Sequence, residues 1–185
     1  MKKSIQRWEW AGVIFIILFG ASLHFAFEWS GYARPVAIIA AVNESTWEHF
    51  KIAFWPAFIW ALIEYPILKH QTRNFIVAKA AGLLTMPLVI AVLFYSYTII
   101  TGEHFLIADI IIFILAVIAG QWVSMRLLIG AAIEIVWLKR LALSLILIMV
   151  LANATLSYYP PKNFLFAHPD SGEYGILAEY HHDDH

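Results

Sequence analysis

The side chains best suited to metal chemistry occur close together in the first third of the chain. His24 and Glu28 are spaced four residues apart, which places both on one face of a helix. Glu44, Glu48 and His49 follow within one short stretch. The chain has no cysteine, so imidazole and carboxylate groups are its only strong metal ligands. This set of donors is typical of a zinc, iron or manganese site.

The first prediction is a divalent metal site, with zinc as the first candidate. His24, His49 and Glu44 are the expected ligands. Glu44 and Glu28 are the candidate catalytic carboxylates, because a carboxylate that does not bind the metal can act as a general base on water that the metal activates. No fixed motif such as His-Glu-x-x-His supports the assignment.

The two acids near His49 are expected to have different roles. Asn43 or Ser45 can cap a helix that begins here, and an acid at the third helical position then folds back onto the backbone. We therefore expect Glu48 to serve the helix N-terminus and Glu44 to face the metal. The alternative is a purely structural segment in which His49 donates a hydrogen bond to a carbonyl.

These residues must be positioned by membrane helices. Of the 185 residues, 62% are hydrophobic and 14% are charged, a composition that cannot cover a core with polar surface. Five apolar runs approach the 20 residues needed to cross a bilayer. The fold class is therefore an all-α, multi-pass bundle of five transmembrane helices, with predicted spans at residues 10–29, 50–68, 78–100, 105–127 and 141–158.

Lysine and arginine are distributed unequally between the two faces of this predicted bundle. Nine of the twelve fall on the side of the N-terminus, which the positive-inside rule assigns to the cytoplasm. The N-terminus is then inside and the C-terminus outside, in the inner (cytoplasmic) membrane. We expect a bundle over residues 1–159 and an outer tail over residues 160–185. Two short apolar segments, residues 35–42 on the outer face and 129–137 on the inner face, are expected to be re-entrant or interfacial connectors packed on the bundle.

Other polar residues suggest structural roles. Glu64 and Lys79 are expected to form an ion pair near the inner face, with a proton relay as the alternative. Asp109 needs a partner, for which Lys51, Tyr95 and Tyr97 are candidates. The tail is expected to fold back over the outer end of the bundle, where His168 would be an exposed turn residue or, as the alternative, would reach the metal-ligand group. The last five residues, His-His-Asp-Asp-His, are expected to collect metal ions or to be a solvated end.

The sequence resembles an uncharacterised family of prokaryotic five-helix integral membrane proteins, a domain of unknown function. The resemblance is carried by Leu23-His24-Phe25 with Glu28-Trp29, by the run Val-Asn-Glu-Ser-Thr-Trp-Glu-His-Phe-Lys at residues 42–51, by Glu64-Tyr65 and by Asp109, with further matches in the tail. It implies the architecture and no activity. Glu44-Ser45 and Trp47-x-His49 are also similar to the first motif of progestin and adipoQ receptors, relatives of alkaline ceramidases. That similarity implies a zinc-dependent amidohydrolase acting on lipids.

Three classes of function remain open at this point. The first is a metal hydrolase with an amphiphilic substrate, and the second is a carrier, channel or sensor for a cation. The third is a non-catalytic accessory subunit, in a homo-oligomer or a larger membrane complex. Haem held between His24 and a second histidine is a further alternative. The partner that the composition requires is the lipid bilayer. Nucleic acid is excluded because the net charge of −1 provides no general basic field.

Overall fold

The computed structural model describes residues 2–178 and consists of five long helices with two short 3₁₀ turns. All five long helices are long and apolar enough to span a membrane. No β-strand occurs among the described residues. The helices are α1 (Lys2–Trp29), α2 (Thr46–Leu68), α3 (Phe75–Thr101), α4 (Leu106–Ile129) and α5 (Val136–Thr155), and the 3₁₀ turns are η1 (Arg34–Ile38) and η2 (Gly175–Ala178).

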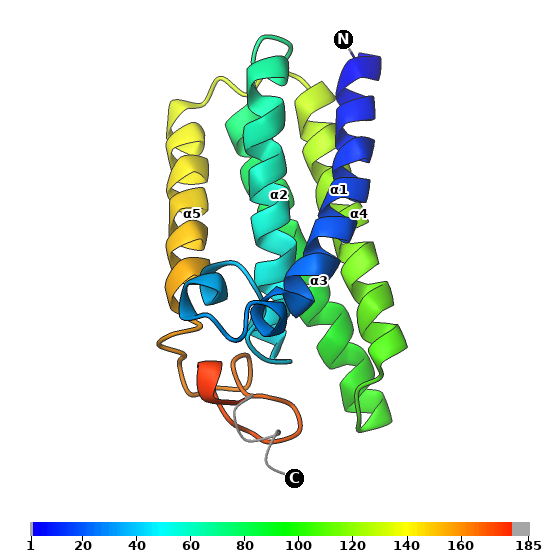
Figure 1. Ribbon diagram of the computed structural model, residues 1–185. Coiled ribbons are helices and arrows are strands. Elements are labelled where there is room, and N and C mark those ends of the chain that lie inside the picture. Colours follow the sequence, from blue (N-terminus) through cyan, green and yellow to red (C-terminus); the bar gives the residue numbers. More distant parts are fainter. Residues whose placement is uncertain (1, 179–185) are drawn as a thin grey trace.

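The helices alternate in direction, so the loops gather at two ends of the bundle (Figure 1). The N-terminus lies at one end with the α2–α3 and α4–α5 connections; we call this the amino-terminal end. The opposite end carries the α1–α2 segment, the α3–α4 turn and the tail, and we call it the carboxy-terminal end. α5 packs mainly on α3 at the side of the bundle and is the most exposed of the five.

Glycines allow α3 and α4 to approach closely. A Cβ added to Gly82 would lie 2.9 Å from the backbone oxygen of Gly120, and one added to Gly120 would lie 2.8 Å from that of Gly82. Small residues of this kind are typical of packed membrane helices, because association there depends on close van der Waals contact. Around them, an apolar core formed by α1 to α4 includes Ile16, Phe54 and Met86.

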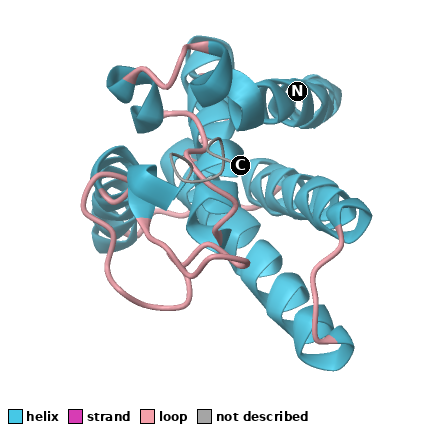
Figure 2. Cartoon of the chain, turned by 60° about the horizontal axis from the view of Figure 1, so that its bottom comes forward, coloured by secondary structure: helices cyan, strands magenta, loops and turns pink. Residues whose placement is uncertain are grey.

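The carboxy-terminal end is covered by the longest irregular segments (Figure 2). The backbone N–H of Trp47 donates to the Leu165 carbonyl at 2.9 Å, and the Trp47 ring stacks on Phe166 at 4.8 Å between centroids. The Asn43 amide also donates to the Gly175 carbonyl at 3.0 Å. The tail therefore packs against the start of α2, as expected from its apolar residues.

The helix ends differ from the predicted spans. α1 begins eight residues earlier than predicted, because its polar first turns remain helical and bury Glu9 against α3 and α4. α5 begins at Val136, so only residues 130–135 are irregular where residues 129–137 were expected to connect. The amide Nδ2 of Asn74 shapes this connection by donating to the carbonyls of Leu127 and Ala131, each at 2.8 Å.

The segment at residues 35–42 packs on the bundle, as expected. It consists of η1 and a following stretch in which Ala40, Ala41 and Val42 are buried. The Ala41 N–H donates to the carbonyl of Leu23 on α1 at 3.2 Å. This hydrogen bond fixes the segment against α1 just before it enters the candidate site.

Candidate metal centre

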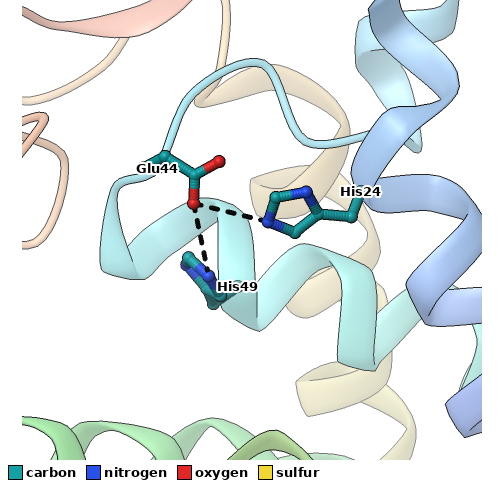
Figure 3. A group of neighbouring side chains, drawn as sticks. All are labelled: His24, Glu44 and His49. Atoms are coloured by element: carbon teal, nitrogen blue, oxygen red, sulfur yellow. Dashed lines mark ion pairs between the residues drawn. The ribbon is translucent and has the colours of Figure 1, made fainter. Parts of the chain in front are cut away.

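Three separate elements bring His24, Glu44 and His49 together. His24 lies near the end of α1, Glu44 in the segment that leads into α2, and His49 in the first turn of α2. Asn43 shapes the segment locally, because its side-chain oxygen accepts a hydrogen bond from the Ser45 N–H at 2.8 Å. The resulting turn directs Glu44 toward both histidines, as Figure 3 shows.

The three side chains have the geometry of a ligand set. Glu44 Oε2 lies 3.3 Å from His24 Nε2 and 3.8 Å from His49 Nε2. One ligand atom from each residue lies within 4.8 Å of the other two, close enough for all three to contact one ion. All three residues are partly buried, so the group is reachable from outside the bundle.

His49 is held in the tautomer that a metal ligand requires. Its Nδ1 lies 3.0 Å from the Ser45 carbonyl oxygen. A carbonyl only accepts hydrogen bonds, so Nδ1 carries the proton, and in the neutral ring the lone pair is on Nε2. That nitrogen faces Glu44. Metal-bound histidines in proteins almost always donate their second ring N–H to a carbonyl or carboxylate in this way.

Electrostatics keep Glu44 ionised. Burial raises the pKa of the Glu44 carboxyl, but the hydrogen bond with His24 and the charges that His24, His49 and His168 carry when protonated outweigh it, so the pKa lies below its ordinary value. A carboxylate is the form that binds a cation.

A cavity of about 220 Å³ adjoins the group. Glu44 and the two histidines line one side, and Asp109 on α4 reaches the same cavity. Tyr97 donates its hydroxyl proton to Asp109 Oδ1 at 2.5 Å, and His104 Nδ1 lies 3.3 Å from Asp109 Oδ2, so Asp109 has two partners, of which Tyr97 is the one expected from the sequence. The rest of the lining is apolar and comes mainly from α1 and α4: Ile17, Ala21, Phe25, Ile52, Leu106, Ile110, Phe113 and Ile114.

Glu48 is buried away from this cavity. Its Oε2 lies 2.5 Å from Lys51 Nζ and accepts a hydrogen bond from the Val42 N–H at 3.2 Å, while Oε1 accepts one from the Ser157 hydroxyl at 2.7 Å. Lys51 also donates to the Ala37 carbonyl at 2.9 Å. Glu48 thus joins the α1–α2 segment to the end of α5, which is a structural role but not a capping box. Lys51 is its partner and not that of Asp109.

Glu28 lies outside the group that the structure assembles. Its side chain is exposed, and among the described residues the metal-ligand group contains only His24, Glu44 and His49. His24 and Glu28 lie one helical turn apart on α1, as predicted. The segment that carries Glu44 packs against α1 beside His24, one turn before Glu28. The ligand group that the structure assembles among the described residues therefore does not include Glu28.

The tail histidine differs from its expected place. His168 is buried, and its Nδ1 accepts hydrogen bonds from the backbone N–H groups of Asp170 and Ser171 at 3.2 and 3.4 Å. It was expected to be exposed in a turn. The histidine-rich end of the chain, residues 181–185, lies outside the described residues.

The chain belongs to DUF6512, a family of unknown function, whose model matches residues 1–176. No curated protein and no solved structure matches it. The architecture of five apolar helices agrees with the resemblance drawn from the motifs, and the family supplies no activity.

Proposed function

We propose that the protein is a membrane-embedded metal hydrolase whose site contains zinc or a similar divalent ion. His24, His49 and Glu44 would hold the ion. The observation that carries the proposal is that one ligand atom each of His24, Glu44 and His49 lie within 4.8 Å of one another. The hydrogen bond from His49 Nδ1 to the Ser45 carbonyl turns Nε2 toward Glu44 at 3.8 Å. A neutral imidazole lone pair and a carboxylate repel each other, so a cation between them is favourable: a proton on Nε2 in the protein alone, or a metal ion that replaces this proton.

A site with three protein ligands can activate water for hydrolysis. Catalytic zinc sites use three protein ligands and leave a position for water, whose pKa the ion lowers toward 7. The general base is then a carboxylate that is not a ligand. Asp109 fits this role better than Glu28, since Asp109 lines the cavity and is oriented by Tyr97. Glu28 is exposed and outside the group.

The cavity favours an amphiphilic substrate. Its polar side is formed by the candidate ligands, and its larger side is apolar and lies between α1 and α4. Phe25, Leu106 and Ile110 are at once cavity-lining and exposed on the outside of the bundle, where lipid would lie. An acyl chain could therefore enter sideways from the membrane while its ester or amide reaches Glu44. With the C-terminus outside the cell, the site would serve the outer leaflet of the cytoplasmic membrane.

A continuous path for a cation is less favoured. Among the described residues, the apolar core that includes Ile16, Phe54 and Met86 separates the Glu44 group from Glu64 and Lys79 along α1 to α3. Side chains of this kind offer a moving ion no oxygen ligands. The carrier hypothesis would need this core to open.

The experiment uses zinc-loaded protein and acyl esters and amides of increasing chain length, presented in mixed micelles. We expect hydrolysis of long-chain substrates, lost in Glu44→Ala and retained in Glu103→Ala, an exposed acid at the same end. Ala21→Phe should fill the cavity and reduce activity on long chains more than on short ones, with metal content unchanged. Activity that survives Glu44→Ala, or the absence of activity on every chain length, would contradict the proposal.

Two further variants identify the base. Asp109→Asn should lower kcat with metal retained, whereas Glu28→Gln should not. The opposite pair of results would return the general-base role to Glu28.

A further inference from the structure

A second group of ionisable side chains meets inside the bundle, toward the amino-terminal end. Lys79 on α3 lies between Glu9 on α1 and Glu64 on α2. Its Nζ is 2.6 Å from Glu9 Oε1 and contacts Glu64 Oε1 as well. The three side chains are 5%, 2% and 0% exposed, in that order. The pair of Glu64 and Lys79 expected from the sequence is therefore a triad, with Glu9 as the third member.

The triad has one more acid than base. The groups that face it from neighbouring positions are uncharged: Ser124 on α4 donates to Glu9 Oε1 at 3.1 Å, and the Gln121 amide donates to the Glu9 carbonyl at 3.2 Å. With both carboxylates ionised, the triad would carry one net negative charge in an apolar interior. An uncompensated charge of this kind is strongly unfavourable inside a membrane protein.

Two carboxylate oxygens of the triad are available to bind a proton or another cation that would neutralise its net negative charge. Glu9 Oε2 and Glu64 Oε2 are fully buried and have no hydrogen-bond partner. A small hollow of about 10 Å³ lies beside Glu9, lined also by Val13, Gln121 and Trp122, which is about the space that one water needs. A buried carboxylate oxygen without a hydrogen-bond partner is unfavourable when the group is ionised, and protonation of the carboxyl group removes most of this cost.

We propose that Glu9, Lys79 and Glu64 form a proton-binding site that holds one exchangeable proton between the two carboxylates. One carboxyl group is then neutral, the other pairs with Lys79, and the triad has no net charge. A metal cation would compensate the charge too, but it needs several oxygen ligands and more room than the hollow provides. This site is separate from the Glu44 group and does not depend on the hydrolase proposal.

Substitutions of the two acids should affect the bound proton and the stability differently. Glu9→Gln or Glu64→Gln leaves one carboxylate paired with the Lys79 ammonium. This pair has no net charge, so it needs no additional proton. Each single variant should therefore fold but lose the bound proton. The double variant leaves Lys79 charged and unpaired, so its melting temperature should be well below those of both single variants.

Infrared spectroscopy of the purified full-length protein tests this directly. At pH 8 in a buffer without sodium, we expect the carbonyl stretch of one protonated carboxylic acid, shifted by exchange into deuterated water. The band should be lost in Glu9→Gln and in Glu64→Gln, and retained in Glu103→Gln, an exposed acid outside the triad. Should one Gln variant fail to fold, the other suffices.

Three outcomes would overturn the proposal. The first is a wild-type protein without the band at pH 8. The second is a band that persists undiminished in a well-folded single variant. The third is a band that disappears when sodium is added to the sodium-free buffer, which would assign the site to a metal cation.

Discussion

Removing the charge of Glu48 should destabilise the fold much more than removing that of Glu44. In Glu48→Gln, the ammonium of Lys51 remains buried at 0% exposure without its carboxylate. Breaking a buried ion pair by removing one partner costs about 3–5 kcal/mol. The glutamine still accepts one hydrogen bond, from the Val42 N–H or from Ser157, so the lower half of this range is expected. Glu44 is 43% exposed, and its loss should change stability by less than about 1 kcal/mol.

Thermal unfolding in detergent, followed by the fluorescence of the eight tryptophans, measures both effects. We expect Glu48→Gln to lower the melting temperature by on the order of 10 °C and Glu44→Gln to change it little. The matched control is Glu48→Gln combined with Lys51→Met, which removes both charges. It should recover part of the loss, because no unpaired charge remains.

Two results would refute this reasoning. One is a Glu48→Gln variant as stable as the wild type, which would mean that Lys51 finds water or another partner. The other is a double variant whose loss equals the sum of the losses measured for Glu48→Gln and for the single variant Lys51→Met, since additivity means that the two residues do not interact.

Three further predictions concern packing, pH and topology. Gly120→Ala should destabilise the protein by about 1–3 kcal/mol in the same unfolding assay, because its Cβ would lie 2.8 Å from the Gly82 carbonyl oxygen. The pKa of Glu44 is lowered in the folded protein, so Glu44 stabilises the fold above its ordinary value of 4.5, and this contribution is lost as pH falls through the lower folded value. The melting-temperature difference between wild type and Glu44→Gln should shrink in that range, and a difference constant with pH would oppose the assignment. Because the chain has no cysteine, a single cysteine at Lys162 should react with an impermeant maleimide in intact cells, and one at Arg73 only after permeabilisation; the reverse pattern would invert the topology.

The helices were largely predictable because apolar runs of about 20 residues have few alternatives. The ends of the helices were not predictable, because contacts with residues far away in the sequence decide whether a polar turn is helical or irregular. Glu9 illustrates this: it lies in a charged N-terminal stretch that resembles a flank, yet it is buried by Lys79, 70 residues away.

The candidate site was predictable only in its local part. His49 lies near Glu44 because the two residues are only five positions apart in the sequence. His24 approaches them because the connection between α1 and α2 is short. The role of Glu48 depends on Ser157, which is 109 residues away, and no local pattern reveals that contact. Which of His24 and Glu28 lies beside Glu44 depends on the level at which the α1–α2 segment meets α1, which helical spacing does not determine; the catalytic role expected for Glu28 stays a prediction.

Metal content is the most direct test of the Glu44 group as a metal centre. The protein should be purified without a polyhistidine tag and with His181, His182 and His185 replaced by alanine, so that the C-terminal histidines bind no metal. Elemental analysis after dialysis against zinc should then find about one zinc ion per chain. We expect Glu44→Ala and His24→Ala each to lose it, and Glu48→Gln to retain it. A protein without stoichiometric metal, or with equal metal in all of these variants, would contradict a metal centre formed by His24, Glu44 and His49.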